Sequence, residues 1–250
     1  YYKPHTHDIV NIKYCPVHPE ICDKIFEYIR EKGNIYNISG YVEKTNKGCL
    51  KHVVIRLSEY SKKLLVTFVV NKIENNLKNL ALDLYNNFDE ISGVCINYNP
   101  KKTNVILSDN SECIAGQDYI EEKILDKIFK IGVNTFFQIN PSSAENIFKY
   151  VKDEVSKFEK PVVLDAYAGI AAFGAVVSDA AKSVVSVEEN PKSIELAQDV
   201  LKMNNINNIE LYANDTLKYL KSVKRKFNIS IIDPPRKGCE KEALDEIKKH

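Results

Sequence analysis

The stretch that decides the fold runs from residue 162 to residue 174 and reads Val162-Val163-Leu164-Asp165-Ala166-Tyr167-Ala168-Gly169-Ile170-Ala171-Ala172-Phe173-Gly174. Its first residues form a short apolar run, which predicts a buried strand. The small residues that follow predict a tight turn into a helix. Gly169 is the residue of this turn that would let a ligand approach the backbone at a helix N-terminus.

Strands and helices alternate from this point toward the C-terminus. Apolar runs predict strands at residues 162–166, 184–187, 209–212 and 228–232, and helical spacing predicts helices at residues 142–158, 173–181, 191–204, 215–223 and 240–249. Strict alternation of apolar strands and helices indicates a parallel, doubly wound sheet. Such a sheet binds ligands at the carboxyl ends of its strands.

Acidic residues follow three of these strands. Glu188 lies about 20 residues beyond the glycine turn, where doubly wound folds place an acid that accepts hydrogen bonds from ribose hydroxyls. Capping of the next helix is the alternative for this segment, because Asn190-Pro191 suits a helix start. Asp215 could hold an adenine amino group or cap its helix, and the sequence leaves both roles open.

The most specific motif follows the fourth strand and reads Asp233-Pro234-Pro235-Arg236-Lys237-Gly238. Two prolines make a rigid, extended loop that cannot join a helix. Asp233 can then face a bound ligand while Arg236 and Lys237 face a polyanion. Upstream, Gln138 stands beside paired aromatics, where a buried amide would need partners.

The first half of the chain has a mixed pattern. It predicts helices at residues 18–32 and 71–87, the first ended by Gly33-Asn34. It predicts strands at residues 35–42, 53–57, 64–70, 93–98 and 104–107. The last two are linked so closely that they must pair antiparallel.

Composition excludes little. The chain has 35 basic and 34 acidic residues, so a nucleic-acid surface would have to be a local patch. No apolar run approaches the length of a membrane span and the N-terminus is not a signal peptide, so the expected compartment is the cytoplasm. The six cysteines form no Cys-x-x-Cys pair, which argues against a disulfide framework and against a complete zinc site.

Together these segments resemble the RNA uracil-5 methyltransferases, which use S-adenosylmethionine (SAM). Residues 136–141 (Phe-Phe-Gln-Ile-Asn-Pro) and residues 233–238 are typical of that family, and residues 48–56 are similar to its central-domain segment. The resemblance implies an α/β, Rossmann-like SAM-dependent methyltransferase domain, incomplete, at residues 126–250. It further implies a smaller α+β central domain at residues 1–125.

The resemblance also implies site residues and a reaction. SAM would be contacted by Gln138, Tyr167, Gly169, Glu188, Asp215 and Asp233, and ribosomal or transfer RNA by Arg236, Lys237, His52 and Arg56. The methyl group would go to C5 of an extruded uridine after a cysteine thiolate adds to C6.

Three departures from the family pattern affect these expectations. The glycine turn carries Ala171 and Ala172 where the usual version has a glycine or a small polar residue. The family's N-terminal RNA-binding barrel is absent, as are the upstream cysteines that would join Cys15 in an iron–sulfur cluster, so no cluster is expected. The nucleophile is expected beyond His250. No catalytic residue is therefore assigned in this chain, which alone is expected to be inactive.

Alternatives remain open on the sequence alone. Cys239 as the nucleophile is disfavoured, because three residues separate it from Pro235 and it is expected in the first turn of the next helix. Another class I RNA methyltransferase, or a non-catalytic RNA-binding or scaffold fragment, would share many of these features. A dinucleotide dehydrogenase is disfavoured, since its glycine fingerprint is incomplete here. The sequence does not specify the RNA, the uridine or the oligomeric state.

Overall fold

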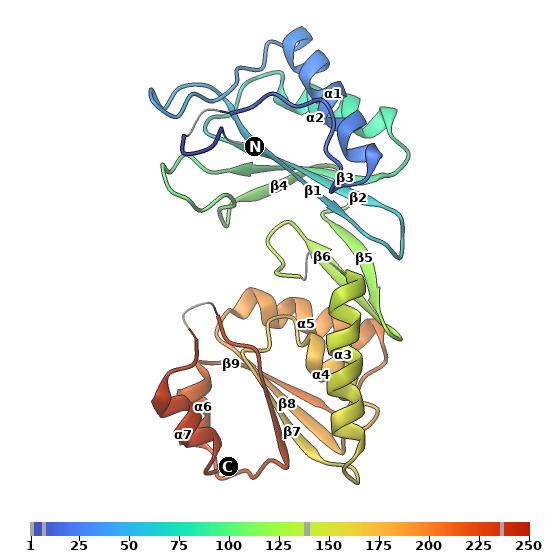
Figure 1. Ribbon diagram of the computed structural model, residues 1–250, viewed down its shortest axis with the longest axis vertical. Helices are drawn as coiled ribbons and strands as arrows, with labels where there is room; N and C mark the ends of the chain where they lie inside the picture. The colour runs from blue at the N-terminus through green and yellow to red at the C-terminus, as the bar shows by residue number, and fades with distance from the viewer. Residues whose placement is uncertain (1–2, 7–8, 138–140, 236–237) are drawn as a thin grey trace. The chain divides into compact units, whose positions relative to one another are not determined.

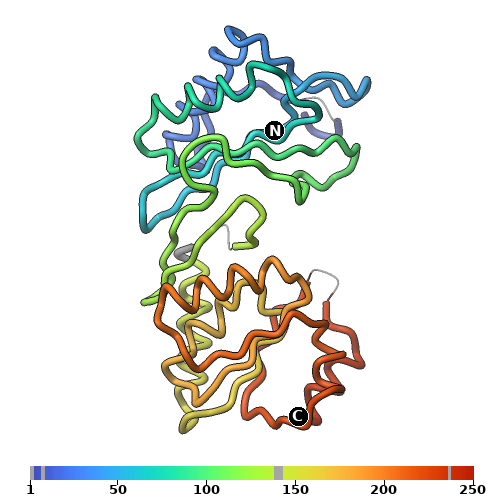
Figure 2. The backbone as a smooth tube through the Cα atoms, turned by 180° about the vertical axis from the view of Figure 1, so that it is seen from behind, coloured from blue at the N-terminus to red at the C-terminus, as the bar shows by residue number. Residues whose placement is uncertain are grey.

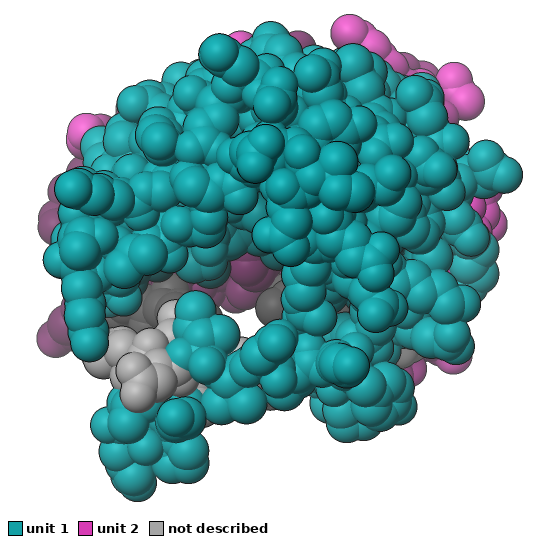
Figure 3. Space-filling view, turned by 90° about the horizontal axis from the view of Figure 1, so that it is seen from above, with its two compact units in different colours: residues 1–58, 62–120, 132–134 teal, residues 59–61, 121–131, 135–250 magenta. Residues whose placement is uncertain are grey.

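The computed structural model describes residues 3–6, 9–137, 141–235 and 238–250. The chain divides into two compact units, which Figure 3 distinguishes by colour. Unit 1 comprises residues 1–58, 62–120 and 132–134, and unit 2 comprises residues 59–61, 121–131 and 135–250. The domain boundary between residues 125 and 126 suggested by the sequence remains a proposal. Within the described residues, no helix combines the length and apolar character needed to cross a membrane.

Unit 1 is built on a four-stranded mixed sheet in the order β1-β2-β3-β4. The strands are β1 (Leu50–Leu57), β2 (Leu64–Val70), β3 (Ile91–Tyr98) and β4 (Ser111–Gly116). Neighbouring strands run antiparallel except β2 and β3, which are parallel and are connected through helix α2 (Leu77–Asn87). Helices α1 (Glu20–Ile35) and α2 cover one face of the sheet (Figures 1 and 2). Their apolar stripes bury Ile25 and Leu80 against Phe68.

Several predictions for helices and strands in unit 1 were wrong, and one of them is the start of α2, which lies at Leu77 and not at residue 71. Helix α1 continues through Gly33 to Ile35, because the helix is held by buried Ile25 and Ile29 and a mid-helix glycine costs only about 1 kcal/mol. The described residues 35–42 form no strand, and residues 40 and 42 make only isolated bridges.

Residues 104–107 were predicted as a strand and instead form a loop, while the strand that pairs with β3 begins at Ser111. Asparagine side chains explain the difference. Asn99 Nδ2 donates to the carbonyls of Val105 and Ile106 at 2.8 and 2.9 Å, and Asn97 Nδ2 donates to Ser108 O at 2.8 Å. These bonds satisfy backbone groups that a strand partner would otherwise satisfy.

Unit 2 contains a four-stranded parallel sheet in the order β10-β7-β8-β9. The strands are β7 (Val162–Ala166), β8 (Ser183–Glu188), β9 (Ile209–Ala213) and β10 (Ile229–Ile232). The chain therefore turns back between β7 and β10, which makes this pair the topological switch point of the sheet. The predicted parallel, doubly wound α/β class is confirmed.

Helices cover both faces of this sheet (Figure 1). They are α3 (Pro141–Ser156), α4 (Ala172–Val177), α5 (Pro191–Met203), α6 (Thr216–Ser222) and α7 (Lys241–Ile247). Alternate residues of β7 face opposite ways: Leu164 packs with Leu220 of α6, and Val163 packs with Val155 and Val177 of α3 and α4. Helix α4 is shorter than the predicted 173–181, since the Ser178 hydroxyl donates to Ala175 O at 2.7 Å and the turn tightens there.

A two-stranded sheet of β5 (Tyr119–Ile124) and β6 (Lys127–Gly132) was not predicted. Two polar contacts hold β6 against the rest of unit 2. The Asn204 side chain exchanges two hydrogen bonds with the backbone of Ile128, at 2.8 and 2.7 Å, as a neighbouring strand would. Lys127, only 7% exposed, forms ion pairs with Asp126 and Asp179.

Candidate functional site at the carboxyl ends of the parallel strands

The buried carboxylate of Asp165 joins β7, β8 and α4. Its Oδ2 atom accepts hydrogen bonds from the Gly174 N–H and from the Ser186 hydroxyl, each at 3.0 Å. A Cβ atom at position 174 would lie 2.7 Å from Ser186 Oγ and 2.9 Å from Asp165 Oδ2. Glycine is therefore required for the helix to approach the sheet this closely. Sequence reasoning missed Ser186, whose only signal was a polar residue within an apolar strand.

Two neighbouring carboxylates act on the buried carboxyl group of Asp165 at this edge. Burial raises the pKa of Asp165 to about 7, the bonds from Ser186 and Gly174 oppose the rise, and the negative charges of Asp233 and Glu188 add to it. A cation near such acidic groups offsets their mutual repulsion and favours their ionised forms. The arrangement therefore favours a positively charged ligand at this edge.

The turn after β7 runs through left-handed backbone. Tyr167, Gly169 and Ala171 have φ angles of 60°, 56° and 58°. Gly169 faces open space, since a Cβ there would meet nothing within 4 Å. Ala171 precedes α4 as its N-terminal flanking residue and is fully buried. The left-handed conformation costs an L-residue about 1–2 kcal/mol, so Ala171 stands at a position that favours glycine.

Glu188 is held in place from two sides by backbone donors. Its Oε2 atom accepts from the Gly169 N–H and its Oε1 atom accepts from the Asn190 N–H, both at 2.9 Å. Asn190 itself caps α5, because its side chain accepts from the Lys192 N–H at 3.0 Å. Glu188 is thus not the cap of α5, and each of its oxygens keeps a lone pair for another donor.

Asp215 performs the capping role that the sequence had left open. Its side chain accepts from the Lys218 N–H at 2.9 Å and caps α6. A ligand role for the same carboxylate stays a prediction.

Tyr167 reaches across to the segment before α7. Its hydroxyl and the Cys239 thiol lie 3.2 Å apart, and its ring packs against Tyr219 and Leu220. Burial and then the Cys239 contact raise its pKa, so the phenol keeps its proton at neutral pH. The sequence gave no signal for this contact.

The loop after β10 is described only in part. Asp233 is exposed, and Gly238 donates its N–H to Pro235 O at 2.7 Å with a φ of 81°. Helix α7 begins at Lys241, so the expectation that Cys239 lies in its first turn was wrong. Gln138, Arg236 and Lys237 lie outside the described residues.

The two other predicted RNA contacts lie in unit 1, on one face of β1. His52 is exposed, and its pKa is lowered by desolvation and by the charge of Lys51. Arg56 is half-buried; its Nη2 atom donates to Val133 O at 3.1 Å, and burial lowers its pKa. Its Nε atom is buried without a hydrogen-bond partner among the described residues.

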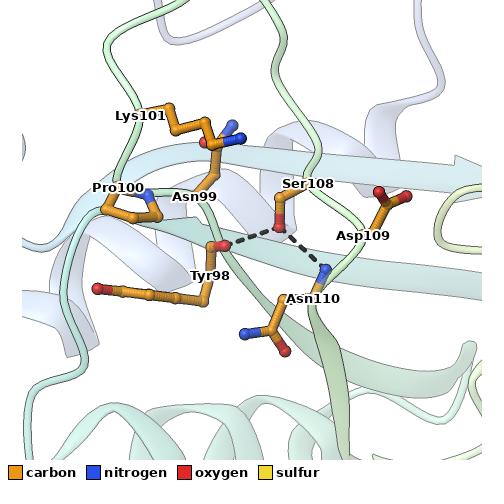
Figure 4. A pocket seen from close by; sticks show the side chains of 7 residues that line it. All are labelled: Tyr98, Asn99, Pro100, Lys101, Ser108, Asp109 and Asn110. Carbon is orange, nitrogen blue, oxygen red and sulfur yellow. Dashed lines mark hydrogen bonds between the residues drawn. The ribbon is translucent and has the colours of Figure 1, made fainter.

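A shallow pocket in unit 1 contains none of the predicted residues (Figure 4). It is formed where the loop after β3 returns to β4. Ser108 closes it by donating to Tyr98 O at 2.7 Å and accepting from the Asn110 N–H at 3.1 Å. Because these bonds satisfy the loop internally, the pocket is best explained by loop packing.

The chain is similar in sequence to proteins described as RNA methyltransferases. The chain is 34% identical over 248 residues to a Gloeobacter violaceus protein named as an uncharacterized RNA methyltransferase, covering 99% of this chain and 54% of that protein. A protein of the same description from Clostridium acetobutylicum is 32% identical, with 99% and 55% covered. The chain thus spans about half the length of the curated relatives it matches. The family described as conserved hypothetical protein 95 matches residues 142–250.

A solved structure matches nearly the whole chain. It is the Pyrococcus abyssi tRNA (uracil-54, C5)-methyltransferase in complex with S-adenosyl-L-homocysteine, with a TM-score of 0.81 and 26% identity over 98% of this chain and 59% of that one. A tRNA m1G37 methyltransferase from M. jannaschii matches at a TM-score of 0.50 and 16% identity over 89% of this chain and 61% of that one, which reflects the fold alone. The Rossmann-like methyltransferase fold predicted from the sequence is confirmed.

Proposed function

We propose that this chain is the cofactor-binding part of a SAM-dependent RNA methyltransferase that methylates C5 of uridine in ribosomal or transfer RNA. The observation that carries the proposal is the contact between Gly169 N–H and the Glu188 carboxylate beside the switch point of the sheet. Doubly wound folds bind nucleosides at this place. The uridine specificity is supported by the similarity to the Pyrococcus abyssi enzyme and by the motif at residues 233–238.

The described residues fit SAM chemically. SAM carries a positive sulfonium, an ammonium group and two ribose hydroxyls. Glu188 would accept from the ribose hydroxyls, while the exposed Asp233 supplies negative charge close by. The open space beside Gly169 would admit the cofactor to the backbone. Tyr167, Asp215 and Gln138 complete the proposed set.

When bound, SAM would supply the methyl group. The rest of the reaction needs a thiolate that adds to C6 of the uracil, a role that we assign to no residue of this chain. Its own residues would bind and orient the cofactor and hold RNA phosphates. We propose Arg236, Lys237, His52 and Arg56 for the RNA contacts, because guanidinium and ammonium groups are the usual phosphate ligands and an imidazole N–H can also donate a hydrogen bond.

Calorimetric titration of SAM into the chain tests the cofactor site. The wild type should bind saturably, and Glu188→Ala and Asp233→Ala should each weaken binding at least about tenfold, or about 1.4 kcal/mol. Glu195→Ala is the matched control, since this exposed acid lies on α5 away from the strand ends and its loss should leave binding unchanged. Circular dichroism must show that all variants are folded.

A non-catalytic RNA-binding role is favoured by one observation, the strained alanine at position 171 in the cofactor turn. Absence of SAM binding by a folded wild-type chain that retains RNA affinity would support this second function.

A further inference from the structure

Two cysteines of unit 1 lie directly opposite each other across β3 and β4. Cys95 is the register partner of Cys113. Tyr98 donates its N–H to Asn110 O at 2.9 Å, so that pair is hydrogen-bonded. Bonded and non-bonded pairs alternate along an antiparallel ladder, and three steps from Tyr98 place the cysteines in a non-bonded pair. In a regular ladder the Cα atoms of such a pair lie about 4.5 Å apart, at the short end of the distances that disulfides span. The register of β3 and β4 shifts directly beside the pair, between Val94 and Cys95.

The two thiols also point to the same side of the sheet. In the neighbouring non-bonded pair, Asn97 Nδ2 donates to Ser111 Oγ at 2.8 Å. Side chains two residues apart on a strand share a face, so Cys95 and Cys113 continue the same row. The two thiols are close enough for each to shift the pKa of the other, and Cys113 Sγ also lies 3.4 Å from Ala115 O.

The surroundings of the two thiols differ. Cys95 is fully buried, whereas Cys113 is exposed. Burial raises the pKa of Cys95 to about 12. Burial also raises the pKa of Cys113, and the contact with Cys95 opposes that rise. Because Cys113 is exposed and Cys95 is buried, Cys113 is the thiol that an external disulfide can reach.

We propose that Cys95 and Cys113 form a reversible dithiol–disulfide site that reacts with low-molecular-weight disulfides. The Cys113 thiolate attacks one sulfur of the disulfide, forms a mixed disulfide and releases one thiolate. Cys95 loses its proton to solvent and attacks Cys113 Sγ, which forms the intramolecular bond and releases the second thiol. The protein loses two hydrogens, and the small disulfide is reduced to two thiols.

This site is separate from the proposed cofactor site, whose residues lie in unit 2. The described thiols outside the pair are poor competitors. Cys15, Cys22 and Cys49 are buried, and Cys239 is half-buried in contact with Tyr167. Oxidation should therefore start at Cys113.

Incubation of the reduced chain with excess oxidised glutathione tests the site. After an acid quench, the intact mass before alkylation should lie two hydrogens below that of the reduced chain. After alkylation of the remaining thiols, the oxidised chain should carry two fewer alkyl groups than the reduced chain, and peptide mapping should find Cys95 joined to Cys113. Cys95→Ser should instead accumulate one stable glutathionyl group on Cys113. Cys239→Ser is the matched control and should form the internal disulfide as the wild type does.

The wild-type map decides the outcome even if the Cys95 variant does not fold. A glutathionyl group that stays on Cys113 of the wild type, a link between other cysteines, or no reaction at all would each overturn the proposal. Reduction with dithiothreitol should restore the starting mass.

Discussion

Burial of Asp165 should make the stability of unit 2 depend on pH. Its side chain belongs to a residue only 2% exposed, and its pKa is raised by burial from 3.8 to about 7. The folded state therefore holds this proton more tightly than the unfolded chain. Its contribution to stability is fully present below about pH 4 and is lost as the pH rises through about 7.

The size of the effect follows from the shift. Each pKa unit corresponds to about 1.4 kcal/mol, and a change from 3.8 to about 7 corresponds to about 4 kcal/mol. Domains are stable by about 5–15 kcal/mol, so the loss would be a large part of the total. The cysteine and tyrosine groups with raised pKa values ionise above this window.

Replacement by asparagine tests the reasoning, because Asp165→Asn keeps an oxygen that can accept from Gly174 and Ser186. Urea unfolding between about pH 4.5 and about pH 8 should show the variant gaining about 3 kcal/mol relative to the wild type as pH rises, because part of the shift is already expressed at the lower pH. Asp126→Asn is the control. Burial opposes ionisation of Asp126, but hydrogen bonds from Lys127 and Lys152 outweigh it and lower its pKa to about 2.

The control variant should therefore differ from the wild type by a constant amount across this window. Parallel curves for Asp165→Asn and the wild type, within about 1 kcal/mol, would refute the claim that the buried carboxyl group is protonated near neutrality.

Three further substitutions test local geometry by thermal unfolding or hydrogen exchange. Ala171→Gly should stabilise the chain by about 1 kcal/mol, because glycine adopts the φ of 58° at this position without strain. Ala172→Gly, at the first residue of α4, should destabilise the chain by about as much. Equal effects of the two substitutions would contradict the claim that the backbone of Ala171 is strained. Gly174→Ala should cost about 1–3 kcal/mol, because its Cβ would lie 2.7 Å from a side-chain oxygen. Gly33→Ala should not destabilise the chain, because a Cβ atom at this position of α1 would meet nothing within 4 Å. A similar loss of stability in Gly174→Ala and Gly33→Ala would contradict the claim that α4 approaches the sheet closely at Gly174. Asn204→Asp should speed amide exchange in β6 by removing its donor to Ile128 O; unchanged exchange would show that the contact is dispensable.

The buried strands at the centres of the two sheets were the most predictable part of the fold. The predicted strands at 162–166 and 64–70 match β7 and β2 residue for residue, because continuous apolar runs between turn signals leave few alternatives. The β5–β6 sheet could not be predicted, since its inward positions include charged residues. Buried Glu122 accepts hydrogen bonds from the backbone of Glu59, Tyr60 and Lys123, partners that only the folded chain brings near.

The candidate site was predictable to a similar degree. The places of Gly169 and Glu188 followed from the order of strands and turns, because parallel strands bring their carboxyl ends to one edge. The contacts of Asp165 with Ser186 and of Tyr167 with Cys239 depend on strand register and loop path. Neither is encoded in a local pattern, which is why the sequence gave no indication of them.

The acidic residues at the sheet edge differ in the hydrogen bonds that their carboxylates already accept within the fold. One carboxylate oxygen of Asp215 accepts the hydrogen bond that caps α6. An N-cap contributes about 1 kcal/mol to helix stability whether or not a ligand binds. The Glu188 carboxylate is instead fixed between the N–H groups of Gly169 and Asn190 with acceptor sites left over. When a carboxylate is already oriented, binding of a ligand does not lose the conformational entropy of ordering that side chain. Of the two, Glu188 is therefore the residue on which binding of a nucleoside cofactor should depend more strongly, and Asp215 the one whose loss would first be felt as lost helix stability.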